Sequence, residues 1–221
     1  MQRRFPRRAA GLRLKASLAA YSRSRDAPPG SFRGLHRPLP VTPKNPSASR
    51  TRMNELVLPN DTNTLGNLMG GRLLHFMDVA GGIAAMRHSN RTCVTASVDN
   101  VDFKSAISLG EVVLIEAVVN RAFTTSMEVE IDVWAEDTAT GTRRKCNRAF
   151  YTFVAVDQSG RPIPIPGVEP ETDEEHERYD GAGRRRELRL ILSGRLNLAD
   201  ATDLREHLAA ATAKAPAPVD A

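Results

Sequence analysis

The sequence predicts an α+β domain in which one antiparallel sheet wraps around a single central helix. The first observation is the segment Leu73–Met86, which is apolar on almost every helical face and therefore indicates a buried helix. The second is the strict apolar–polar alternation over 127–136, which is typical of a half-buried strand. The third is the set of turn signals, which place one strand before the helix and four after it. We expect these four strands to form a meander.

The elements follow in order along the chain. The first strand is expected at 49–58, where Pro59 ends it, and Ser89-Asn90 is expected to end the helix. Alternation in 92–103 slips by one residue at Asp99-Asn100, which predicts a β-bulge. The remaining strands are expected at 112–121, 127–136 and 145–157, with turns between them.

One carboxylate, Asp78, lies in the middle of the apolar helix, where a lone charge is costly unless it is paired or used. Two interpretations remain open from the residues alone. Asp78 is either structural, bonded to a neighbour such as His75 one turn earlier, or a general base or nucleophile. The pair Gly70-Gly71 would place backbone N–H groups at the start of a helix, where negative charge is favoured, and Asn67 adds an amide.

Charge is distributed very unevenly along the chain. Residues 1–52 hold thirteen Lys and Arg and one acidic residue, Asp26, so this segment has a net charge of +12. The whole chain has a net charge of +5, which leaves −7 for the remainder. The basic character therefore belongs to the N-terminal arm, and a nucleic-acid surface on the domain is not expected. We also expect no membrane association, because no apolar run has transmembrane length.

The two cysteines, Cys93 and Cys146, lack the spacing of a metal site, and both fall in predicted strands. We expect buried free thiols rather than a disulfide, and we expect no metal.

The run VLPNDTNTLGNLMGGRLLHFMDVAGGIAA, from Val57 to Ala85, resembles the signature of hotdog-fold acyl-CoA thioesterases. That family includes brain-type cytosolic acyl-CoA hydrolase and the bacterial short, broad-specificity acyl-CoA thioesterases. The likeness continues through VTASVDNVDF and FVAVDQSGRPIPIPG and covers about residues 50–170. The resemblance implies a hotdog fold and hydrolysis of acyl-CoA to free fatty acid and coenzyme A without a cofactor, within fatty acid metabolism.

The resemblance also implies roles for particular residues. Asp78 on the helix and Asn67 on the loop match the family's catalytic pair, which opposing hotdog units contribute. Asp78 would act as general base on water or attack directly, and Asn67 would orient the water or the carbonyl. The backbone N–H of Gly71, with that of Gly70, would polarise the thioester oxygen.

Coenzyme A carries phosphates, so basic residues are expected near the mouth of the site. The candidates are Lys104, Arg148 and Arg184, with solvent-facing charge an equally good interpretation of each. The resemblance further implies a homo-oligomer, a dimer of hotdog units, and related members also form trimers of dimers.

The sequence divides into three parts: a disordered or leader segment at 1–48, a hotdog domain at 49–170 and a partly helical extension at 171–221. The segment Glu171–Glu177 is expected to begin a short outer helix, and 199–214 an amphipathic one. The basic N-terminus is either a disordered extension or a transit peptide, so a cytoplasmic location has the mitochondrial matrix as its alternative.

Two other functions remain as alternatives. A hotdog enoyl-CoA hydratase or dehydratase would use a catalytic His before a carboxylate, whereas the loop here holds Asn67 and no His. A non-catalytic acyl-CoA-binding regulator would need a DNA-binding segment, but residues 1–48 hold seven prolines and no helix-turn-helix pattern.

Overall fold

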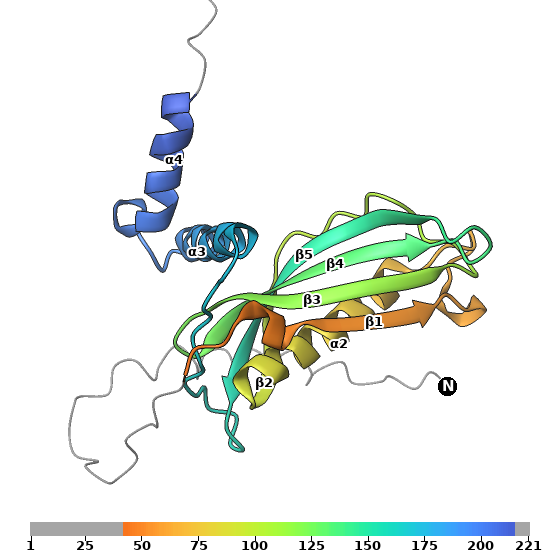
Figure 1. The fold of residues 1–221 in the computed structure, drawn as a ribbon, viewed down its shortest axis with the longest axis horizontal. Coiled ribbons are helices and arrows are strands. Elements are labelled where there is room, and N and C mark those ends of the chain that lie inside the picture. The colour runs from red at the N-terminus through yellow and green to blue at the C-terminus, as the bar shows by residue number, and fades with distance from the viewer. Residues whose placement is uncertain (1–41, 215–221) are drawn as a thin grey trace, which may run out of the picture. The chain divides into compact units, whose positions relative to one another are not determined.

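A computed structural model describes residues 42–214, and the fold is that of a sheet folded over a helix (Figure 1). Helix α2 (Gly70–Ser89) lies along one face of the sheet, and α3 (Asp173–Leu192) and α4 (Thr202–Lys214) follow the last strand. Three short 3-10 turns of the described chain occur at Pro46–Ser49, Pro59–Asp61 and Leu198–Asp200. The strands are β1 (Thr51–Leu56), β2 (Thr92–Val98), β3 (Val112–Ala122), β4 (Ser126–Glu136) and β5 (Arg143–Val156).

All strand pairs are antiparallel, and the strand order is β1-β3-β4-β5-β2. The meander therefore comprises β3, β4 and β5 only. The prediction that β2 belongs to it was wrong, because β2 crosses to the far edge and pairs with β5. A pattern of alternation identifies a strand but does not identify its neighbour.

The bulge in β2 also lies elsewhere than predicted. The register shifts between Thr95 and Ser97, and the strand ends at Val98, before the predicted slip at Asp99-Asn100. The Asp99 N–H still donates to Phe150 O, at 3.0 Å, and the chain then leaves the sheet. The apolar residues after it belong to a connecting segment, 99–111, and not to a strand.

The inner face of the sheet and one face of α2 form the core. Strand β4 contributes every second residue to this core. Its inward side chains are fully buried: Met127, Val129, Ile131, Val133 and Ala135. They pack with Phe76, Met77, Ala80 and Ala84 of α2, as a strand of period two and a helix of period 3.6 require.

Helix α2 is apolar all round, but only one of its faces is buried within the single chain. Val79 and Met86 on the other face are 38% and 43% exposed, and Val94 and Val98 of β2 are 47% and 45% exposed. Helix α2 and strand β2 therefore leave an apolar surface uncovered, which is typical of an interaction face. We call it the α2–β2 surface.

Two adjacent glycines in α2 test how closely this helix approaches the sheet. A Cβ on Gly81 would lie 2.9 Å from both Ile131 and Phe153, whereas one on Gly82 would meet only Phe153, at 3.7 Å. Alanine gains about 1 kcal/mol of helix propensity at either position. We expect Gly81→Ala to be less stable than Gly82→Ala by about 1–3 kcal/mol, because only Gly81→Ala overpacks the core. Denaturant unfolding of both variants measures this, and equal midpoints would contradict the close approach.

The described chain begins before the boundary predicted at residue 49. Lys44 forms a bridge with Val168, and the turn Pro46–Ser49 packs against α2 and β3. Most of the predicted N-terminal segment, residues 1–41, lies outside the described residues.

At the other end, α3 is a single helix of 20 residues that continues well beyond Glu177, with a capping box formed by Thr172 and Glu175. Within residues 42–214, no helix is both long and apolar enough to cross a bilayer.

Candidate active site

Asp78 lies on α2, half-buried, where the core meets the α2–β2 surface. Thr95 of β2 donates a hydrogen bond from Oγ1 to Asp78 Oδ1 at 2.6 Å. Tyr151 is fully buried nearby, and burial together with the negative charge of Asp78 raises the pKa of Tyr151 to about 12. The partner of Asp78 is thus Thr95 and not His75, whose exposed ring contacts Phe76. The carboxylate is oriented by a hydroxyl and keeps Oδ2 without a partner among the described residues.

The glycine pair forms the first two residues of α2. Met69 occupies the N-cap and offers no side-chain hydrogen bond. The first amides that bond within the helix are those of Arg72 and Leu73, both to Met69 O, so the N–H groups of Gly70 and Gly71 have no acceptor among residues 42–214. A Cβ on Gly71 would meet nothing within 4 Å, which leaves room at these amides for a ligand. Free amides at a helix start favour negative charge.

Two asparagines of the loop before α2 line one hollow of about 310 Å³. Asn67 Oδ1 is 3.5 Å from the Ser108 hydroxyl, and its backbone forms a bridge with the same residue. Asn63 Oδ1 accepts from the N–H groups of Leu65 and Asn67, at 2.9 and 3.2 Å. The carboxamide NH₂ groups of Asn63 and Asn67 both lack a partner in the described chain. Asn63 was not predicted from the sequence, although it lies in the same motif.

The rest of the hollow is formed by the helix start and by the connecting segment 99–111. The phenyl ring of Phe103 lies 3.2 Å from where a Cβ of Gly70 would be, so an alanine there fits only if the ring moves by a few tenths of an ångström. The other residues lining the hollow are Leu68, Leu73, Ser105, Ala106 and Ile107.

The three basic candidates are placed differently. Lys104 is exposed and follows Phe103 directly, beside the hollow. Arg148 lies on the outer face of the sheet, where its Nε is 2.8 Å from Asp132 Oδ1 and 3.0 Å from Glu130 Oε1. Arg184 is half-exposed on α3. None of the three is among the residues that line the hollow, but Lys104 lies between two that do, Phe103 and Ser105.

Within one chain, the helix start and Asp78 are too far apart to meet at one thioester. Asp78 lies nearly two helical turns after Gly71, and at about 1.5 Å per residue this places their backbones about 10 Å apart.

Among the described residues, no group of three His, Cys, Asp or Glu side chains could hold a metal ion. Both cysteines are free thiols, and burial raises the pKa of each.

Comparison with known proteins gives several close relatives. A protein-family model described as "Thioesterase superfamily" matches residues 65–142 of this chain. The uncharacterized acyl-CoA thioester hydrolase YkhA of Bacillus subtilis is 44% identical over 119 residues, which are 54% of this chain and 69% of the relative. Acyl-coenzyme A thioesterase 11 of Mus musculus is 40% identical over 67% of this chain, which spans only 24% of that longer protein.

Solved structures agree with the fold. A hexameric acyl-CoA thioesterase superposes with a TM-score of 0.66 at 42% identity, over 68% of this chain and 97% of its own. An acyl-CoA hydrolase of Staphylococcus aureus, solved with butyryl coenzyme A and coenzyme A, has a TM-score of 0.63 at 35% identity, over 76% and 99%. Structures of that hydrolase include alanine variants of an asparagine, of an aspartate after it and of a threonine further on. On its sequence, its strand order and these relatives, the chain belongs to the hotdog-fold acyl-CoA thioesterase family.

Proposed function

We infer that the protein hydrolyses acyl-CoA thioesters to a carboxylic acid and free coenzyme A. The observation that carries this inference is the carboxylate of Asp78, which Thr95 holds on the central helix at the edge of an uncovered apolar surface. The relatives named as acyl-CoA hydrolases support the reaction, and the butyryl coenzyme A held by the Staphylococcus aureus hydrolase supports the class of substrate.

In the proposed mechanism, Asp78 acts as a general base. Its free Oδ2 accepts a proton from water while the water oxygen bonds to the thioester carbon. The C–S bond then breaks, the sulfur of coenzyme A leaves as a thiolate, and that thiolate takes up a proton. The Thr95 hydroxyl fixes the rotamer of the carboxylate, so that Oδ2 points to the water and little orientation is lost at the moment of reaction.

The free amides of Gly70 and Gly71 are proposed to bind the oxyanion that forms on the carbonyl oxygen. Because about 10 Å separates them from Asp78 of the same chain, one site needs Asp78 from one copy and the helix start from another. The α2–β2 surface, with Val79, Val94 and Val98 exposed, suits a second copy as its partner. The hexameric relative supports such assembly, with a dimer of hotdog units as the smallest complete form.

We favour Asn63 over Asn67 as the asparagine that contacts the substrate or the water. Asn63, Asp78 and Thr95 have the same spacing along this chain as the asparagine, aspartate and threonine varied in the Staphylococcus aureus hydrolase. Both asparagines line the hollow and both have their side-chain oxygen engaged, so this choice depends on the spacing along the chain. Lys104 remains the best placed of the three basic candidates for a phosphate of coenzyme A.

We propose a cytoplasmic location, with the mitochondrial matrix as the alternative. A relative from Rattus norvegicus that is 35% identical over 145 residues is named a cytosolic acyl coenzyme A thioester hydrolase, and this supports the proposal.

Release of free thiol from acetyl-, butyryl- and palmitoyl-CoA tests the proposed function. We expect the wild type to release thiol from at least one of the three, and Asn63→Ala to lose at least about tenfold more kcat/KM than Asn67→Ala. A hydration assay with an enoyl-CoA on the same sample tests the hydratase alternative. Hydration without thiol release would contradict the proposed function.

A further inference from the structure

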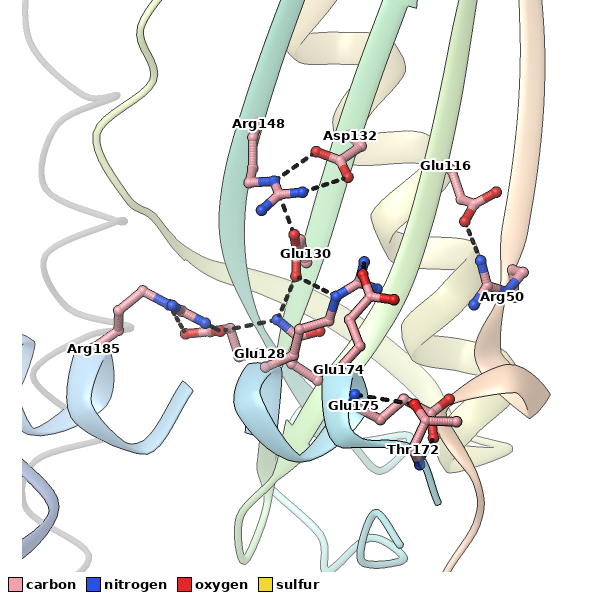
Figure 2. A network of polar contacts seen from close by, with 12 residues as sticks. Arg50, Glu116, Glu128, Glu130, Asp132, Arg148, Thr172, Glu174, Glu175 and Arg185 are labelled. Carbon is pink, nitrogen blue, oxygen red and sulfur yellow. Dashed lines mark hydrogen bonds and ion pairs between the residues drawn. The ribbon is translucent and has the colours of Figure 1, made fainter. Parts of the chain in front are cut away.

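Helix α3 is attached to the outer face of the sheet through a carboxylate of β4 that lies buried beneath it. Glu128 of β4 points away from the core, yet its side chain is 0% exposed. Figure 2 shows Arg185 of α3 bonded to the Glu128 carboxylate. Its Nη2 donates to Oε1 at 2.6 Å, and its Nε lies 3.2 Å from both oxygens. A buried carboxylate is tolerated only when it is paired in this way, so the packing of α3 depends on its arginines.

A second arginine of α3 makes a different connection. Both terminal nitrogens of Arg189 lie 3.4 Å from Glu128 Oε2, and Nη1 also donates to Asp99 Oδ2 at 2.5 Å. Asp99 is the residue that directly follows β2 and begins segment 99–111. Arg189 therefore ties the end of the strand that carries Thr95 to a buried anchor on β4. Arg185 binds the same anchor without touching Asp99.

Segment 99–111 has further anchors, and these come from the loop before α2 and from β5. In that loop the Leu68 N–H donates to Ile107 O at 2.7 Å, and the Leu109 N–H of the segment donates to Gly66 O at 2.9 Å. Asn147 donates to Asp102 O at 2.9 Å, and Arg144 donates to Ala106 O at 2.7 Å. Between these points the segment contributes Phe103, Ser105, Ala106 and Ile107 to the hollow. The backbone of Asp99 is held by its N–H bond to Phe150 O, and the Arg189–Asp99 pair is the side-chain contact at the start of the wall. Among these contacts it is the one supplied by the C-terminal extension.

We propose that Arg189 is a positioning residue for the active site, which acts through Asp99 to hold the wall of the hollow in the geometry that binds coenzyme A. This proposal rests on the proposed function. Arg189 has no place among the residues lining the hollow and acts only through the segment that it holds. A wall released at Asp99 would bind substrate less well, while Asp78 and Thr95 would keep their bond.

Steady-state kinetics with the full chain and butyryl-CoA test the proposal. We expect Arg189→Met to raise KM about fivefold or more while kcat stays within about twofold, the pattern of lost binding rather than lost chemistry. Asp99→Ala is expected to reproduce this, and the double variant with Arg189→Met to be no worse than either single one, because each change removes the same contact. Arg189→Lys, which keeps a donor, should restore part of the effect.

Arg185→Met is the matched control, because it also removes a guanidinium from Glu128. We expect it to lower the melting temperature at least as much as Arg189→Met but to leave KM unchanged. An equal rise in KM for both variants would show a merely structural role and overturn the proposal, as would an unchanged KM in Arg189→Met. Hydrogen exchange of 99–111, faster in Arg189→Met only, gives a readout without turnover. If the wild type shows no turnover, the proposed function fails, and exchange alone then decides whether Arg189 holds the segment.

Discussion

Asp78→Asn is expected to lower kcat/KM for acyl-CoA hydrolysis by at least about a hundredfold, a loss of about 2.7 kcal/mol in transition-state stabilisation. Asparagine has nearly the same shape as aspartate and can still accept the Thr95 hydrogen bond, so the fold around it should be kept. It cannot take a proton from water, however, and this is the function that the mechanism assigns to Oδ2.

His75→Ala is the control for this experiment. His75 lies on α2 one turn before Asp78 and is exposed, with no hydrogen bond to Asp78. We expect its kcat/KM to stay within about threefold of the wild type, since it holds no group that the mechanism uses. Melting temperatures of both variants show whether each is folded. Wild-type turnover in Asp78→Asn would exclude a carboxylate base at this position.

The local elements of this fold could be predicted from the sequence because each has its own period. The apolar run after Gly71 predicted α2, and the alternation from Met127 to Glu136 predicted β4. The position of β2 could not be predicted, because the partner of an edge strand depends on pairing between distant residues. The bulge at Thr95 was also missed. The apolar residues after Asp99 looked like a continuation of the strand, so the slip was placed at Asp99-Asn100, but these residues belong to a connecting segment.

A residue of the candidate site could be predicted where its polarity differs from that of its neighbours in the sequence. Asp78 was recognised because a carboxylate is unusual in an apolar helix. Thr95 gave no such signal, because a threonine in a strand is ordinary and its partner lies on a different element. Solvent-facing charge was an equally good interpretation of Arg184 on α3, and the alternation along β4 places Glu128 on the polar face of that strand. The docking of α3 buries Glu128 completely, and the pattern along one strand does not predict this docking.

Mixed dimers of two inactive variants are expected to regain activity, because each active site is shared between two copies. Asp78→Asn and Asn63→Ala are each expected to be nearly inactive as pure proteins. In a two-fold dimer that combines one chain of each kind, one site receives both changes and the other receives intact Asp78 and intact Asn63. Random pairing makes half of the dimers mixed, so about a quarter of all sites should be intact.

Thiol release by the two variants after co-expression tests whether the site is shared. We expect recovery of about a quarter of the wild-type rate per chain, although each variant alone is nearly inactive. Recovery must also be absent when the two purified proteins are mixed without exchange of subunits. Co-expressed protein that is no more active than the two separate variants would contradict a shared site and place all catalytic groups within one chain.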